Sequence, residues 1–394
     1  MKSFRIALVA PFLFPERGAC PARTHSLAEF LREKKCQVTL FAPARENIAE
    51  SHSVTRYADE KDLYDRISSE RFDLVWATSP PMTHALIAGF AAKMAGSRFV
   101  ADVRDPWAYE TWSRQNKQVV DLKVIAFSFI EWLTQLLADR IFIVSKTIAN
   151  HMSALSIAPT PKTKFVVVPN GTLEEKFGFR PAARTRLRKK WNISPKTVIG
   201  MYAGAFVYPD TDRLISLLKN SFQKNALKFI FLVPFTKPDA ENPSKRIPTD
   251  EAIALRTYFA KEGIDKHIEF IDGNAVSNDE LGDYFSAADF GIVTLNKELD
   301  YCVPVKVYDY AGNGMHVFAT GAAAGELDTF ISKDERGGFS PNLENLAEKI
   351  TAFISHYHFS AAERKKRSSE TAKKFSRMHS NEIAHREFEL LLSK

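Results

Sequence analysis

The sequence has few cysteines, and none of them are paired in a motif. Its 394 residues include only Cys20, Cys36 and Cys302, with no CxxC spacing. So few widely separated thiols exclude a disulfide-stapled fold and give no support to a cysteine-based zinc cluster. We therefore expect a protein that folds in a reducing compartment.

Long apolar runs are also missing. The amino-terminal run is only about ten residues long, contains Arg5 and continues into Pro-Glu-Arg, which is unlike a cleavable signal peptide. Asp121, Lys123 and Glu131 interrupt the most apolar later stretch, residues 119–137, so it falls short of a membrane span. We interpret the first run as a buried strand and predict a soluble cytoplasmic protein, attached to a membrane only by its surface.

The signatures of several enzyme classes are absent as well. There is no GxxxxGK[ST], HExxH, GxSxG or kinase loop, and no GxGxxG after the first predicted strand. These absences argue against P-loop enzymes, zinc peptidases, serine hydrolases, kinases and dinucleotide-dependent dehydrogenases. Asp210-Thr211-Asp212 has the acid-x-acid form of some metal-dependent sugar transferases. About one such triplet is expected by chance in a chain of this length, and we interpret the acids as helix caps.

The composition is that of an ordinary globular protein of about two domains. Hydrophobic residues make up 45% of the chain and charged residues 26%. Lysine and arginine outnumber the acids by 54 to 47, which gives a net charge of +7. This balance fits an anionic ligand, nucleic acid or an anionic membrane surface, and the charge alone does not choose among them.

Short apolar runs alternate with helical patterns along the whole chain. This rhythm predicts, in each half, a parallel sheet covered by helices on both faces. A polar, basic stretch at residues 172–196 is interpreted as a linker with one short helix, and residues 361–394 as helical. The predicted strands are residues 4–10, 37–42, 73–77, 98–102, 140–145, 165–169, 197–204, 228–234, 267–271, 289–295 and 315–319. The other predicted helices are residues 24–35, 84–95, 119–137, 212–219, 250–262 and 279–288.

The loop after the first strand is one candidate site. Gly18 and Ala19 stand just before a helix whose first turn contains Arg23, Thr24 and His25. Small residues at a helix N-terminus let a ligand approach closely and meet unpaired N–H groups. A plain strand-to-helix connection would have the same appearance, and the loop alone favours that interpretation.

A second candidate lies at the end of a predicted strand, in the sequence Asp102-Val103-Arg104-Asp105-Pro106-Trp107. Ligands of open α/β sheets collect at the carboxyl ends of strands. Two acids, a guanidinium and an indole would suit such a ligand. The alternative is that Arg104 pairs with an aspartate to brace the loop while Trp107 packs in the core.

A third candidate follows Pro304. Lys306 and Asp309 are three residues apart on a predicted helical turn, which places them on adjacent surface. Lys306 with free N–H groups would suit a phosphate, and Asp309 could accept hydrogen bonds from ribose hydroxyls. A surface ion pair of little energetic value is the alternative.

Taken in order, several segments resemble glycosyltransferase family 4, which has the GT-B fold. They are PARTHSLAEFLREK, CQVTLFAP, DVRDPW, FIVSKTIANHM, VVVPNG, GMYAGAF and VPVKVYDYAGNGMHVFATG, and they run from residue 4 to about residue 325. The resemblance implies an α/β fold with two doubly wound Rossmann-like domains that face a cleft. It places an acceptor domain at residues 1–180, a nucleotide-sugar domain at 181–372 and a C-terminal helix at 373–394 that returns to the first domain.

The resemblance also implies an activity. A hexosyltransferase of this family would move a sugar from a nucleotide-diphosphate sugar, with UDP-sugars favoured, to an acceptor hydroxyl with retention at the anomeric carbon. The acceptor would be a glycan or lipid-linked glycan in surface polysaccharide biosynthesis, and no metal or other cofactor is expected. The apolar stretch 119–137, with cations such as those of residues 184–190, would hold the protein on an anionic membrane surface.

The family pattern is only partly kept. Where members often have two glutamates seven residues apart, this chain has Tyr301 and Asp309. Ala205 and Asp210 stand where many members have basic anchors for the diphosphate, so Lys306 is our replacement candidate. The implied site has Asp105, Lys306 and Arg104 as catalytic residues; Gly18, Ala19, Gly204, Lys237, Tyr301, Pro304, Val305, Lys306 and Asp309 around the donor; and His25, Arg23 and Trp107 on the acceptor side.

Two other functions remain open at this point. A sugar-nucleotide epimerase can share the two-domain architecture and would act on the donor without an acceptor. A nucleic-acid-binding protein is suggested only by charge. The basic runs at residues 184–190 and 364–374 lack interleaved aromatic residues and any known module, so we expect no nucleic-acid partner.

Overall fold

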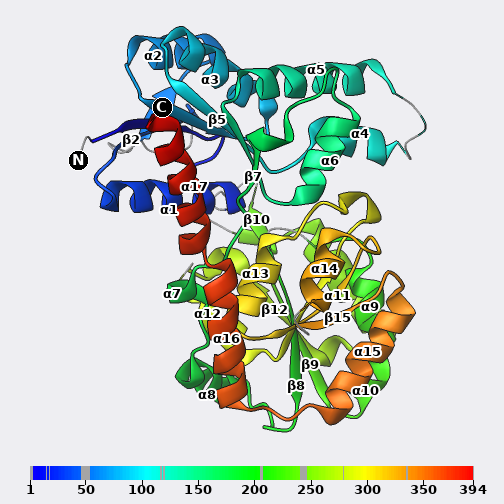
Figure 1. Cartoon of the computed structure of the whole chain (residues 1–394). Helices are drawn as coiled ribbons and strands as arrows, with labels where there is room; N and C mark the ends of the chain where they lie inside the picture. Colours follow the sequence, from blue (N-terminus) through cyan, green and yellow to red (C-terminus); the bar gives the residue numbers. More distant parts are fainter. Residues whose placement is uncertain are drawn as a thin grey trace. The chain divides into compact units, whose positions relative to one another are not determined.

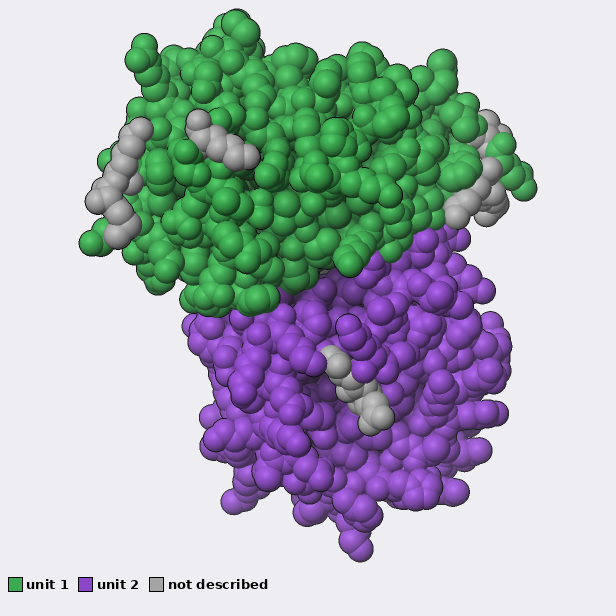
Figure 2. All heavy atoms as spheres, viewed as in Figure 1, with its two compact units in different colours: residues 1–170, 377–394 green, residues 171–376 purple. Residues whose placement is uncertain are grey.

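The computed structural model describes residues 3–14, 16, 18–45, 54–115, 118, 120–204, 207–239, 246–277, 279–333 and 336–393. The chain divides into two compact units, shown in Figures 1 and 2. The first contains residues 1–170 and 377–394, and the second contains residues 171–376. The divisions therefore fall after residues 170 and 376, where the sequence placed them after 180 and 372.

The first unit is built on a seven-stranded parallel sheet in the order β3-β2-β1-β4-β5-β6-β7. The sheet consists of β1 (Arg5–Val9), β2 (Gln37–Pro43), β3 (Val54–Tyr57), β4 (Leu74–Thr78), β5 (Arg98–Val103), β6 (Arg140–Ile143) and β7 (Phe165–Val167). The helices are α1 (Ala19–Glu33), α2 (Glu60–Ser69), α3 (Met82–Met94), α4 (Trp107–Arg114), α5 (Leu122–Leu137), α6 (Lys146–Ala154) and α17 (Arg377–Leu392), with a 3-10 turn, η1 (Lys162–Lys164).

The second unit repeats this plan with six parallel strands in the order β12-β9-β8-β13-β14-β15. Its strands are β8 (Val198–Ala203), β9 (Leu227–Val233), β12 (Ile268–Asp272), β13 (Phe290–Thr294), β14 (His316–Thr320) and β15 (Gly337–Phe339), with a separate antiparallel pair, β10 (Thr236–Pro238) and β11 (Arg246–Pro248). Its helices are α7 (Glu174–Phe177), α8 (Pro181–Lys190), α9 (Thr211–Leu217), α10 (Lys219–Gln223), α11 (Asp250–Glu262), α12 (Leu281–Ala287), α13 (Val305–Gly312), α14 (Glu326–Ser332), α15 (Leu343–His356) and α16 (Ala361–Phe375). Three 3-10 turns are η2 (Asp265–His267), η3 (Gly273–Ala275) and η4 (Lys297–Leu299).

Uniform burial explains why the central strands were recognisable in the sequence. All five residues of β4 and all six of β8 are buried, as in a parallel sheet that is covered on both faces. Numbered within each unit, both sheets begin with the strand order 3-2-1-4-5-6 of a doubly wound fold. The predicted fold class is confirmed.

The C-terminal chain leaves the second unit after α16 and joins the first as α17, which lies beside α1 in Figure 1. Ala384, Phe388 and Leu391 on α17 belong to the apolar core of the first unit. The Phe388 ring stacks on Phe142 of β6, with ring centroids 5.6 Å apart. The C-terminal helix, which was predicted to return to the first domain, is therefore held there by core packing.

The prediction of a basic linker at residues 172–196 was wrong. This segment forms α7 and α8, and α8 packs against α12. Arg184 and Arg188 are only 6% and 8% exposed because both bind the buried carboxylate of Asp289. These arginines hold the second unit together, so they are not cations of a free surface.

Helix α5 contains most of the apolar stretch for which the sequence predicted contact with a membrane surface. It buries several of its polar residues, among them Ser128, Glu131 and Thr134. Four of its large apolar side chains are instead exposed: Leu122 by 84%, Ile125 by 51%, Phe129 by 46% and Leu136 by 60%. The helix thus turns an apolar face outward, the reverse of an ordinary surface helix.

Candidate functional site

The strand order reverses once in each sheet, between β1 and β4 and between β8 and β13. Chains that leave neighbouring strands at such a point cross to opposite faces of the sheet, which opens a crevice at the carboxyl ends of the strands. Candidate ligand-binding residues are therefore sought at this edge of each unit, and the two edges are described separately.

In the second unit, Lys306 lies at the carboxyl edge on the first turn of α13. Its Nζ donates a hydrogen bond to the Tyr202 hydroxyl at 2.9 Å. The same ammonium group lies 4.0 Å from the ring centroid of Tyr202 and 4.6 Å from that of Tyr208. Tyr202 is itself held by the Tyr208 amide, which donates to its hydroxyl at 3.0 Å. Two rings from β8 and the following loop therefore orient the lysine.

Lys306 is poorly solvated for a lysine. Burial lowers the pKa of its amine to about 7, because the charged form loses contact with water and gains no carboxylate partner strong enough to offset the loss. A lysine in this condition gains most when an anion arrives, since the anion supplies the missing opposite charge. The geometry therefore suits an anionic ligand such as a phosphate.

Asp309 lies on α13 one turn after Lys306 and is 7% exposed. Its neighbour Tyr310 is buried under the sheet and accepts a hydrogen bond from the Ala203 amide at the end of β8. Burial and the nearby charge of Asp309 raise the pKa of the Tyr310 phenol. The helix is thus anchored on β8, which fixes Lys306 and Asp309 at the same edge.

Other predicted donor residues are spread around this edge. Pro304 occupies the N-cap of α13 and Val305 is its first residue, while Gly204 follows β8 with a φ of 155°. Tyr301 is 1% exposed, so it is part of the core. Lys237 lies on β10, where its amine is 3.3 Å from the Asp250 carboxylate. Ala205 lies outside the described residues.

The interpretation of Asp210 and Asp212 as helix caps was only partly right. Asp210 stands at the N-cap of α9, but its backbone is left-handed, with a φ of 62°, and its side chain makes no capping bond. Asp212 accepts from the amide of Arg213 instead. Within the described part of the chain, no group of three or more histidine, cysteine or acidic side chains could hold a metal ion.

In the first unit, side chains from α1 and from the carboxyl ends of β4 and β5 form a buried polar network. Asp102 is fully buried and accepts two hydrogen bonds from the guanidinium of Arg23 on α1, at 2.7 and 3.1 Å. The Thr78 hydroxyl donates to the same carboxylate at 2.8 Å. Arg23 also donates to the carbonyls of Val168 and Pro169. The guanidinium predicted for the acceptor side therefore links α1 to β5 and to the segment after β7.

The loop after β5 carries the other residues of the DVRDPW segment. Arg104 donates to the Ser79 carbonyl at 2.8 Å, which ties the loop to the end of β4. Asp105 is partly exposed beside it. Trp107 opens α4 and contacts Phe127 of α5, with ring centroids 4.8 Å apart. Arg104 therefore braces the loop through a backbone carbonyl, the structural role that the sequence left open for it.

The loop before α1 keeps its expected form. Gly18 is the N-cap, with a φ of 139° that strongly favours glycine, and no side chain caps the helix. Ala19 is the first helical residue. His25 is bound to Glu29 one turn later, with 2.9 Å between Nε2 and the carboxylate, and its ring meets Phe14 edge-on. The predicted small residues therefore stand at the start of α1, and His25 is held by Glu29 and Phe14.

Sequence reasoning missed Glu131 as part of this edge. Glu131 is 2% exposed on α5 and accepts from the Ala108 amide at 3.1 Å, so it caps α4 in place of an ordinary N-cap side chain. Burial raises the pKa of its carboxyl to about 7 despite the amide bonds of Trp107 and Ala108. The sequence shows that Glu131 interrupts the apolar run 119–137, but it does not show that Glu131 binds the Ala108 amide just after the DVRDPW segment.

We predict that this carboxyl makes the protein less stable as the pH rises. The pKa is raised in the folded state, so the folded chain holds more protons than the unfolded chain between about pH 4.5 and pH 7, and stability falls across that window. Glu131→Gln keeps an acceptor for Ala108 without the charge. In urea unfolding, the free energy of unfolding of the variant relative to wild type should rise by about 1–3 kcal/mol between pH 5 and pH 8. A constant difference would contradict the assignment.

Comparison with known proteins agrees with the fold. Residues 22–175 match the model of the family described as Glycosyltransferase Family 4. No curated protein sequence matches the chain. None of the helices in the described part of the chain has the length and apolar character needed to cross a membrane.

Several solved structures share the fold over nearly the whole chain. HepE of Anabaena, in complex with UDP and glucose, is 12% identical with a TM-score of 0.71, covering 98% of this chain and 99% of its own. A glycosyltransferase from Rickettsia africae is 12% identical with a TM-score of 0.69, covering 100% and 99%. WaaG, a glycosyltransferase involved in lipopolysaccharide biosynthesis, is 12% identical with a TM-score of 0.64, covering 96% and 98%. The chain therefore has the GT-B fold over its length and resembles the glycosyltransferases of family 4, whose model it matches over residues 22–175.

Proposed function

We propose that this protein is a retaining glycosyltransferase of the hexosyltransferase type that uses a nucleotide-diphosphate sugar. The observation that carries the proposal is the placement of Lys306 and Asp309 on α13 at the carboxyl edge of the second sheet, with Lys306 held by the Tyr202 hydroxyl. The similarity to HepE, solved with UDP-glucose, supports a UDP-sugar as donor. No metal ion is needed in this proposal.

Lys306 would act on the leaving group. As the bond between sugar and diphosphate breaks, negative charge grows on the β-phosphate, and a positioned cation lowers the energy of that state more than that of the ground state. The pKa of about 7 means that the approaching diphosphate would also draw a proton onto the amine. Tyr202 and Tyr208 fix the direction of the ammonium group before the ligand arrives.

Asp309 would recognise the donor's ribose, and Lys237 is the second candidate for contact with the diphosphate. On the first unit, Asp105 would lie near the reacting sugar or the acceptor hydroxyl as a hydrogen-bond acceptor or base. Arg104 would position it, since its bond to Ser79 fixes the loop in which both residues stand. Trp107 and the Gly18–Ala19 turn would contact the acceptor and the donor, respectively.

We expect Asp309→Ala to weaken the binding of nucleotide without unfolding the protein. The loss of one charge-assisted hydrogen bond to ribose costs about 1.5–3 kcal/mol, or roughly 10- to 150-fold in affinity. Asp309→Glu should be the mildest change, because it keeps the carboxylate. Titration calorimetry with UDP measures both variants, and an unchanged affinity in Asp309→Ala would remove this residue from the donor site.

We also propose that the acceptor is a glycan or lipid-linked glycan of surface polysaccharide, and that the protein works on the cytoplasmic face of a membrane. The outward apolar face of α5 supports this, because Leu122, Ile125, Phe129 and Leu136 would be buried among lipid chains. Lys123 on the same helix is exposed and can meet anionic headgroups. Arg184 and Arg188 no longer contribute, since both are buried against Asp289.

The membrane proposal predicts that the protein sediments with anionic vesicles at low salt. Ile125→Glu with Phe129→Glu should release it, because each buried apolar side chain contributes about 1.5–3 kcal/mol. The matched control is Leu217→Glu with Ile253→Glu, which changes two exposed apolar residues of the second unit that are 41% and 53% exposed. Wild-type protein that stays in the supernatant, or equal loss in both variants, would favour a soluble acceptor.

A further inference from the structure

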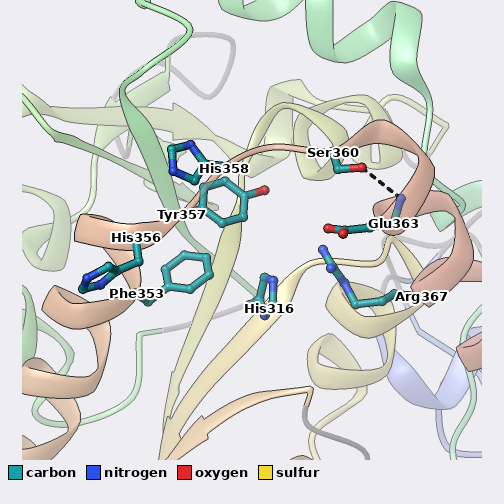
Figure 3. Close-up of a pocket in the computed structure, with 8 residues that line it drawn as sticks. All are labelled: His316, Phe353, His356, Tyr357, His358, Ser360, Glu363 and Arg367. Atoms are coloured by element: carbon teal, nitrogen blue, oxygen red, sulfur yellow. Dashed lines mark hydrogen bonds between the residues drawn. The ribbon is translucent and has the colours of Figure 1, made fainter.

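The second unit has a cavity of about 250 Å³ at the edge of its sheet opposite to Lys306. His316 in its wall is the first residue of β14, whereas α13 follows the carboxyl end of the neighbouring parallel strand β13. The cavity is therefore separate from the proposed donor site. Figure 3 shows its lining, which consists of His316, Phe353, His356, Tyr357, His358, Ser360, Glu363 and Arg367.

One side of the cavity carries two opposite charges from α16. Arg367 uses its Nε to bind the Gly314 carbonyl at 3.1 Å, and neither Nη atom has a hydrogen bond to any described residue. Glu363 stands one turn earlier, and its carboxylate forms no ion pair with the described part of the chain. Figure 3 shows both charged ends on the same side of the cavity. The Arg367 guanidinium can therefore donate hydrogen bonds to a ligand that the Glu363 carboxylate accepts hydrogen bonds from.

The other side of the cavity is aromatic. The rings of Phe353 and Tyr357 are in contact, with centroids 4.7 Å apart, and both come from the end of α15. His316 packs against Phe353 at 4.8 Å, and its ring nitrogens have no hydrogen bond to a described residue. Figure 3 places His316 between the aromatic and the charged sides. The walls therefore combine ring faces with polar groups that converge on one space.

The protein behind the cavity has a surplus of positive charge. Arg364 is completely buried and donates only to uncharged oxygens, those of Phe285, Ala288 and Asn313. Arg184 and Arg188 share the single carboxylate of Asp289. Burial and the charges of Arg367 and Arg364 lower the pKa of His316 to about 4. An anionic group in the cavity would offset this surplus.

We propose that this cavity binds a single acidic sugar unit, with its anionic group on Arg367, hydroxyls on Glu363 and an apolar ring face on Tyr357 and Phe353. A bare inorganic anion would leave the aromatic wall unused and would face Glu363. A plain aromatic molecule would leave both charges without partners. The volume admits one ring, since pockets for drug-sized ligands begin at about 300 Å³. The inference goes beyond the proposed function, because binding here requires neither donor nor transfer.

Titration calorimetry on the full chain tests this proposal with four probes: glucose 6-phosphate, glucuronate, glucose and inorganic phosphate. At least one of the two acidic sugars should bind at one site, at least tenfold more tightly than glucose or phosphate. If only the sugar phosphate binds, the ligand is a phosphorylated metabolite, and if glucuronate binds as well, it is an acidic glycan unit. Both results support an acidic sugar.

The variants separate this site from the donor site and from general charge. Arg367→Gln should weaken acidic-sugar binding at least tenfold, whereas Lys366→Gln, an exposed cation on the same helix, should change it less than twofold. Lys306→Ala should leave the binding unchanged. Failure of both acidic sugars to bind, phosphate binding as tightly as glucose 6-phosphate, or equal loss in Arg367→Gln and Lys366→Gln would each overturn the proposal, and none of these results bears on sugar transfer.

Discussion

Replacing Lys306 with alanine is expected to lower the rate of sugar transfer about 100- to 1,000-fold, the usual effect of losing one group that stabilises developing charge. Nucleotide affinity should fall much less, because the lysine acts mainly on charge that appears as the sugar leaves. Steady-state kinetics with a saturating donor measure both effects. Lys297→Ala is the matched control, since Lys297 is an exposed lysine nine positions earlier in the sequence.

The pH profile of the reaction is a second test of the role of Lys306. Because the pKa of Lys306 is lowered to about 7, the free enzyme carries the charged form mainly below that pH, and kcat/KM for the donor should fall as the pH rises above 7. Lys306→Ala should flatten this part of the profile. A variant that retains full turnover would show that Lys237 or backbone amides stabilise the leaving group instead.

Replacing Asp102 with alanine is expected to destabilise the protein by about 3–5 kcal/mol, the cost of leaving a buried guanidinium without its partner. The carboxylate is completely buried and is bound by both Arg23 and Thr78. Urea unfolding measures the loss. Asp65→Ala is the control, because Asp65 pairs with Lys61 at the surface and its removal should cost less than about 1 kcal/mol.

A double variant tests whether the loss comes from the pair or from the space that it fills. Arg23→Met with Asp102→Leu replaces both charges by apolar side chains of similar size, and it should be clearly more stable than Asp102→Ala alone. If the double variant were less stable than Asp102→Ala, the buried charges themselves would be required.

The strands and the placement of α13 could be predicted because they depend on local pattern. β4 and β8 are continuous apolar runs, and Pro304 begins a helix that carries Lys306 and Asp309 at a spacing of three. The sequence did not predict which residues pair across the chain. Arg23 and Asp102 are 79 positions apart, and the sequence around either residue does not indicate that the two form a pair.

The surroundings of helix α5 and helix α8 could not be predicted for a related reason. An apolar run favours burial, yet α5 leaves Ile125 and Phe129 exposed and buries Glu131, which binds the Ala108 amide of α4. A basic run favours a solvated surface, yet Arg184 and Arg188 are buried because Asp289 lies opposite them, about 100 positions later. In both segments tertiary partners overrode composition. Tyr202, which orients Lys306, could not be assigned to that role for the same reason.

The most direct test of the account is the release of nucleoside diphosphate from UDP-, GDP- and TDP-sugars by the purified protein, with and without candidate glycan acceptors. The account predicts release from one of these donors, most strongly with acceptor and UDP-sugar, unaffected by a chelator and lost in Lys306→Ala but not in Lys297→Ala. It is contradicted if no donor is consumed, if the donor sugar is converted to an isomer without any acceptor, or if a divalent metal is required.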